Sequence, residues 1–157
     1  MATTRFGFPD PVNEVSARLV AAGVVAQGVV IVGLDQPWLI AVLAFGFVAR
    51  VLAGPRFSPL GQFVTRVLTP RLPFRAKYVP GPPKRFAQAI GAALSVAAAV
   101  LHFVVGATTA AYVLVGMIIV AATLESALGF CVGCAIFGLL MRSGVIPASV
   151  CERCNNL

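Results

Sequence analysis

Four long apolar stretches constrain the fold of this chain more than any other feature. Each approaches the roughly 20 residues that a helix needs to cross the hydrocarbon core of a bilayer. Only 11% of the residues are charged, whereas soluble domains carry about 25%. The sequence therefore predicts an all-α integral membrane protein that forms one membrane domain over residues 1–157. The four expected transmembrane helices cover about residues 15–34, 38–53, 86–105 and 107–128.

Short turn signals pair these four spans into two helical hairpins. Asp35-Gln-Pro37 separates the first two spans, and Gly106 followed by threonines separates the last two. The third span carries Gly91, Ser95 and Ala99 at intervals of four residues. Small residues on one face let membrane helices approach closely. We therefore expect this face of the third span to pack against another helix of the same chain.

The segment between the two hairpins predicts the orientation in the membrane. It runs from Arg50 to Arg85 and contains eight Lys or Arg residues and no acidic residue. Cytoplasmic loops carry such an excess of cations. We therefore expect an inner (plasma) membrane protein with this loop and both termini in the cytoplasm. The net charge of +7 is explained by topology, so the expected partner is the lipid bilayer and not nucleic acid.

Residues 58–70 of this loop predict an amphipathic helix. Ser58-Pro59 is typical of a helix start, and apolar residues then fall on one face at Leu60, Phe63, Val64, Val67 and Leu68. Such a helix lies on the inner leaflet or packs against the protein. The prolines of the following segment, residues 79–85, predict an extended and stiff lead into the third span.

Glu125 lies near the predicted cytoplasmic end of the fourth span. An intramembrane carboxylate is costly and is usually paired or functional. Arg18 and Arg50 lie at the same predicted face of the membrane, so the first hypothesis is a buried ion pair between Glu125 and one of these arginines. The second makes Glu125 a base that takes protons from Cys131 or Cys134, six and nine residues further on.

The length of the apolar region around the first cysteines predicts a break in the helix. A single helix over residues 107–141 would be about 50 Å long, too long for a hydrocarbon core of about 30 Å. Gly129 and Gly133 are the natural breaking points. A short re-entrant or interfacial helix over residues 135–141 should follow on the cytoplasmic side. Cys131 would then lie near its N-terminus, where the helix dipole favours a thiolate.

All four cysteines of the chain fall in two CxxC pairs, Cys131–Cys134 and Cys151–Cys154. The sixteen residues between the pairs are long enough to bring them together. Four converging thiolates fit structural zinc, and two dithiols fit disulfide exchange or sulfur transfer. Buried cysteines without a function are the third alternative. A cytoplasmic face is reducing, so permanent disulfides are not expected there.

Three stretches, Phe8–Asn13, Val79–Gln88 and Leu124–Cys134, resemble a bacterial membrane family catalogued as domain of unknown function 4395. The resemblance covers nearly the whole chain. It implies a shared fold and no established activity. It also implies a gene neighbourhood, in actinobacteria, with thioredoxin-like and sulfurtransferase proteins, which favours thiol or sulfur handling with a cytosolic partner of that kind.

These observations lead to one main functional hypothesis, thiol–disulfide or sulfur-relay chemistry at the cytoplasmic segment 129–157. Its reactive groups are Cys131, Cys134, Cys151 and Cys154, with Glu125 as the proton acceptor. One alternative is a non-catalytic membrane anchor or assembly subunit whose four cysteines hold zinc as the cofactor. Another is a small transporter of a sulfur species, with Glu125 and the cysteines lining its path.

Overall fold

The computed structural model describes residues 12–54, 58–73, 75, 77–79 and 81–147. Helices account for about 82% of these residues, which confirms the all-α class. In chain order the elements are β1 (Val12–Asn13), α1 (Glu14–Gly33), α2 (Leu39–Ala53), α3 (Pro59–Phe63), η2 (Val64–Leu68), α4 (Thr69–Arg71), β2 (Tyr78–Val79), α5 (Gly81–Val100), η3 (Leu101–Val105), α6 (Thr108–Leu128) and α7 (Val132–Arg142).

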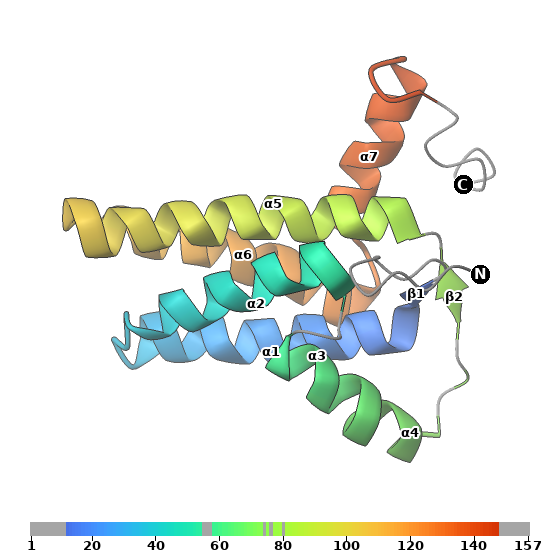
Figure 1. Cartoon of the computed structure of the whole chain (residues 1–157), viewed down its shortest axis with the longest axis horizontal. Coiled ribbons are helices and arrows are strands. Elements are labelled where there is room, and N and C mark those ends of the chain that lie inside the picture. Colours follow the sequence, from blue (N-terminus) through green and yellow to red (C-terminus); the bar gives the residue numbers. More distant parts are fainter. Residues whose placement is uncertain (1–11, 55–57, 74, 76, 80, 148–157) are drawn as a thin grey trace.

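Helices α1, α2, α5 and α6 run alongside one another as a bundle (Figure 1). α1 packs mainly against α6, and α2 packs mainly against α5. A hydrogen bond from Tyr112 Oη of α6 to Asp35 Oδ1 joins α6 to the turn between α1 and α2. Gly106 has a left-handed backbone with φ of 81° and ends the η3 extension of α5. The two predicted hairpins are therefore present, and they pack on each other.

Among the described residues, three helical segments are long and apolar enough to cross a membrane: Glu14–Gly33, Gly81–Val105 and Thr108–Leu128. α2 is apolar but has 15 residues, about 22 Å at the rise of an α-helix. That is shorter than a hydrocarbon core of about 30 Å. The three long helices are consistent with a location in a membrane.

The small residues of α5 form the predicted close contact within the chain. A Cβ atom on Gly91 would lie 2.3 Å from the Phe47 ring of α2, and Ser95 is fully buried. The core around this contact is formed by buried apolar residues of all four long helices, namely Val24, Ile31, Ile40, Leu43, Phe47, Ala98, Ala111, Val115 and Ile118.

The expected extended segment before the third span is wrong for most of its length. Among its described residues, Val79 is extended and pairs, together with Tyr78, antiparallel with β1, but α5 already begins at Gly81. Pro82 and Pro83 lie in its first turn, where no backbone N–H is needed for an intrahelical hydrogen bond and the φ angle of proline suits a helix. The prolines therefore start this helix.

The predicted amphipathic helix is present as the continuous segment α3–η2–α4, which packs against α1. Ser58 caps it, with its Oγ accepting from the N–H of Gly61 at 3.2 Å. Val64 is fully buried and Leu60 packs against the core, while Phe63 is exposed. The contacts favour a loop helix packed on the protein, with Phe63 on its outer side.

The break after the last long helix is confirmed at Gly129. This residue has a left-handed backbone with φ of 68° and ends α6. α7 then begins at Val132, three residues before the expected start, and ends at Arg142. It leaves the bundle at a steep angle, at the end where β1 and β2 lie (Figure 1).

Candidate functional site

Cys131 and Cys134 form a disulfide at the N-terminus of α7. Cys131 is the N-cap residue, and its Sγ accepts a hydrogen bond from the backbone N–H of Cys134 at 3.2 Å. Both residues are half-buried. The sequence placed Cys131 near the start of a short helix, and this is confirmed. A closed pair contrasts with the expectation that a reducing compartment holds no permanent disulfide.

Close packing against α5 fixes the position of this pair. A Cβ atom on Gly133, between the two cysteines, would lie 2.5 Å from both Cα and Cβ of Ala87. Four residues further on, the rings of Phe137 and Phe86 pack with centroids 5.6 Å apart. The absence of a side chain at Gly133 therefore lets the CxxC turn lie directly on α5.

Glu125 pairs with Lys84, and the predicted pairing with Arg18 or Arg50 is wrong. Lys84 Nζ lies 2.5 Å from Glu125 Oε1, and the two side chains are only 8% and 14% exposed. The pairing follows from the early start of α5. Because Lys84 belongs to the first turn of this helix, it shares the face of Gln88 and Gly91 and faces α6 across the bundle.

Arg50 is buried in the last turn of α2 and pairs with neutral groups. Its Nε donates to Gln88 Oε1 at 3.1 Å, and its Nη1 donates to Ser58 Oγ at 2.9 Å. The guanidinium carbon lies 4.7 Å from the centroid of the Phe47 ring. Its Nη2 has no hydrogen-bond partner among the described residues. Arg50 therefore ties the loop helix and α5 to α2.

Arg18 stabilises the end of α6. Its guanidinium donates to the backbone oxygen of Ser126 at 3.0 and 3.2 Å and to that of Ala127 at 3.1 Å. The last carbonyls of a helix have no partner within the helix and carry partial negative charge. Arg18 therefore acts as a C-terminal cap next to the turn that leads to Cys131.

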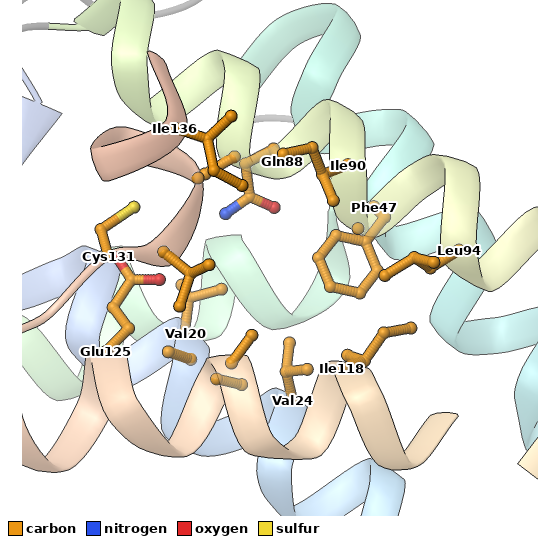
Figure 2. Close-up of a pocket in the computed structure, with 17 residues that line it drawn as sticks. Val20, Val24, Phe47, Gln88, Ile90, Leu94, Ile118, Glu125, Cys131 and Ile136 are labelled. Carbon is orange, nitrogen blue, oxygen red and sulfur yellow. The ribbon is translucent and has the colours of Figure 1, made fainter. Parts of the chain in front are cut away.

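A cavity of about 100 Å³ lies between the four long helices and the start of α7. Its lining is mostly apolar, with polar groups from Gln88, Glu125 and Cys131. Figure 2 shows Cys131 and Glu125 together at one end and Phe47 at the other, with the amide nitrogen of Gln88 pointing into the space between them. The structure therefore brings two of the five predicted site residues, Cys131 and Glu125, to one end of one cavity, and a third, Cys134, is bonded to Cys131.

Residues 12–142 match the family model described as domain of unknown function DUF4395. The chain belongs to this family. The matched region contains the whole bundle, the Lys84–Glu125 pair and the Cys131–Cys134 disulfide. No curated protein matches this DUF4395 protein significantly, and no solved structure does.

The other two predicted site residues of this DUF4395 protein, Cys151 and Cys154, lie outside the described residues. Within the described ranges, no group of three or more His, Cys, Asp or Glu side chains is arranged to hold a metal ion. The four-thiolate site therefore stays a prediction.

Two residues of the site were missed by the sequence analysis, Lys84 and Gln88. Lys84 was counted only as one loop cation, because the prolines before it were taken to prevent a helix. The sequence does contain a pattern that identifies both residues. Positions 84, 88, 91 and 95 follow the spacing of one helix face, and the last two carry the small residues of the expected packing face.

Proposed function

We propose that this chain is a four-span inner-membrane protein that performs thiol–disulfide exchange through Cys131 and Cys134. The observation that supports it is the closed pair at the N-terminus of α7. At that position the helix dipole and the N–H of Cys134 stabilise a thiolate on Cys131. A CxxC turn at a helix N-terminus is a common form of a dithiol that opens and closes reversibly.

The proposed orientation places this pair on the cytoplasmic side. The end of the bundle at which α7 begins carries the buried and exposed cations described above, whereas residues 28–42 and 98–112 at the other end contain no Lys or Arg. This asymmetry supports a cytoplasmic location for the cation-rich end. α2 is the fourth span in this proposal and crosses the bilayer together with the residues that flank it.

The disulfide then represents one state of a cycle, which removes the conflict with a reducing compartment. A cytosolic dithiol protein, of thioredoxin-like or sulfurtransferase type, opens the bond when its thiolate attacks one of the two sulfurs and forms a mixed disulfide. Its second thiol then attacks this mixed disulfide, which releases the reduced Cys131–Cys134 pair and leaves the partner oxidised to a disulfide. The second pair, Cys151–Cys154, is proposed to pass electrons or sulfur between that partner and Cys131. Glu125 lines the same cavity as Cys131, which supports a role as proton acceptor.

A redox titration of the purified protein tests this proposal. The protein is equilibrated with oxidised and reduced glutathione at varied ratios, free thiols are trapped by alkylation, and each cysteine is counted by mass spectrometry. We expect Cys131 and Cys134 to open and close together, with a potential between roughly −120 and −270 mV, the range of catalytic dithiols. Cys134→Ser combined with Cys151→Ser and Cys154→Ser serves as control, since its Cys131 can form no disulfide within the chain at any potential. A pair that never closes, or never opens, contradicts the proposal.

Zinc analysis of the same sample separates the exchange role from that of an anchor with structural zinc. A thiolate zinc site needs both cysteines reduced, so the closed Cys131–Cys134 bond supports the exchange reaction. About one zinc per chain, lost on any single Cys→Ser change, would replace the exchange proposal with the anchor.

A further inference from the structure

The cavity beside Cys131 has the size and chemistry of a site for one planar ring. Its volume of about 100 Å³ is smaller than the enclosed cavity of about 150 Å³ that admits benzene in an engineered protein interior. The cavity is partly open, so a ring can enter it without being fully enclosed. Apart from Gln88, Glu125 and Cys131, the walls are apolar, with Phe47 at the end away from Cys131 (Figure 2). Such walls favour a flat apolar molecule over a small polar one.

The cavity reaches the surface of the molecule beside α7. Ile136 is one of its lining residues and is 39% exposed. α7 leaves the bundle at this point (Figure 1), so the surface there adjoins the predicted edge of the bilayer. A ligand with a hydrocarbon tail can place its ring in the cavity and leave its tail in the lipid.

Gln88 supplies a polar group suited to a ring oxygen. Its Oε1 accepts a hydrogen bond from Arg50 Nε at 3.1 Å, which fixes which end of the amide faces the cavity. The amide nitrogen points into the cavity (Figure 2), and among the described residues it donates to none. A carbonyl oxygen on the ring would accept this hydrogen bond and orient the ring between Gln88 and Cys131.

From this geometry we propose that the cavity binds the ring of a membrane quinone, which oxidises the Cys131–Cys134 dithiol. The inference rests on the proposed exchange function and names the oxidant. The dithiol gives two electrons and two protons to the quinone. Two S–H bonds break, the S–S bond forms, and each of the two ring carbonyl oxygens gains a hydrogen to give the quinol. The Lys84–Glu125 pair at the sulfur end of the cavity receives and passes on a thiol proton.

Mixing the pre-reduced protein with decylubiquinone under anaerobic conditions tests the proposal. All ring carbons of this quinone are substituted, so a thiol cannot replace a ring hydrogen and form a stable adduct. Dithiothreitol is removed first, and loss of quinone absorbance is followed with time in detergent. We expect one quinol for each disulfide formed and a rate that saturates with quinone concentration.

Filling the cavity should block this reaction selectively. Ala121→Leu and Ala122→Leu each add three carbons to the lining, and we expect each to slow quinone reduction by at least about tenfold, the effect of excess bulk in a fitted pocket. Ala110→Leu adds the same bulk to an exposed position of α6 and should change the rate by less than about twofold. Circular dichroism spectra of all three variants identify any loss of fold, and the second filling variant keeps the test valid if one of them unfolds.

The outcomes separate this inference from the exchange function on which it rests. If the protein exchanges with dithiothreitol but does not reduce the quinone, or if both folded filling variants react at the wild-type rate, the quinone site is refuted and the exchange function stands. If the pair cannot be opened by reduced dithiothreitol and closed again by oxidised glutathione, both are refuted. In a background with Cys151→Ser and Cys154→Ser, equal quinone reduction with and without Cys134→Ser would also overturn the site, since the one remaining thiol cannot form a disulfide within the chain.

Discussion

Replacing Glu125 with glutamine should strongly destabilise the protein, because it leaves the Lys84 ammonium charged and unpaired inside the bundle. The two groups are 2.5 Å apart, and their side chains are 8% and 14% exposed. Removal of one partner of a buried pair costs about 3–5 kcal/mol, much of it the penalty of the remaining charge. At 1.4 kcal/mol per factor of ten, the unfolding equilibrium should shift by roughly two to three and a half orders of magnitude.

A double-mutant cycle measures whether this cost belongs to the pair. Glu125→Gln, Lys84→Met and the combined variant are unfolded in mixed detergent micelles and followed by circular dichroism. We expect each single change to destabilise by about 3–5 kcal/mol. The double variant should be at least about 2 kcal/mol more stable than the sum of the two predicts, because it leaves no stranded charge.

The exposed pair at the same end of the molecule provides a matched control. Lys77 and Glu14 are 3.2 Å apart, but their side chains are 75% and 17% exposed. Glu14→Gln should therefore cost at most about 1 kcal/mol. A Glu125→Gln effect no larger than that of this control, or strict additivity in the cycle, would refute the claim that burial makes the Lys84–Glu125 pair important.

Three further predictions test other parts of the structure. Gly133→Ala should displace α7 and destabilise the protein, since its Cβ would lie 2.5 Å from α5, whereas Gly138→Ala meets nothing within 4 Å and should be neutral or stabilising by up to about 1 kcal/mol. Equal thermal unfolding of the two variants would contradict the close packing. Ser58→Ala removes a helix cap and a partner of a buried guanidinium, and denaturant unfolding should show a loss of about 1–3 kcal/mol, whereas an unchanged stability would contradict both contacts. In a background without native cysteines, Leu34→Cys should react with a membrane-impermeant thiol reagent in intact cells while Lys77→Cys should not, and the reverse pattern would invert the proposed topology.

Much of the fold is determined locally and follows from the sequence. The apolar stretches predicted the two hairpins. Backbone polar groups in an apolar environment must bond within the chain, which requires helices, and the length of each apolar stretch can be read from the sequence. Ser58 and Gly129 act within one turn of themselves, as a cap and as a left-handed residue. Ser58 was predicted as a helix start, and Gly129 was predicted as one of two breaking points, of which the other, Gly133, lies within α7. Cys131 at the start of α7 follows from the same break in the chain.

The partner of Glu125 was decided by tertiary structure. The sequence offers many cations near one membrane face, and nothing local chooses among them. The choice depends on the register between α5 and α6, which follows from the start of α5 at Gly81 and from the close fit of Gly91 against Phe47. Lys84 pairs with Glu125. Arg50 therefore bonds to neutral side chains instead, and Arg18 bonds to backbone carbonyls.

The sequence by itself determined an all-α chain with apolar hairpins, a broken last helix and reactive groups concentrated at one end. The tertiary structure decided which of those groups meet. It set Cys131, Glu125 and Gln88 around one cavity although Gln88 is far from the other two in the chain. Such a site requires contacts between helices, and the spacing of residues along one helix carries information only about which face they share.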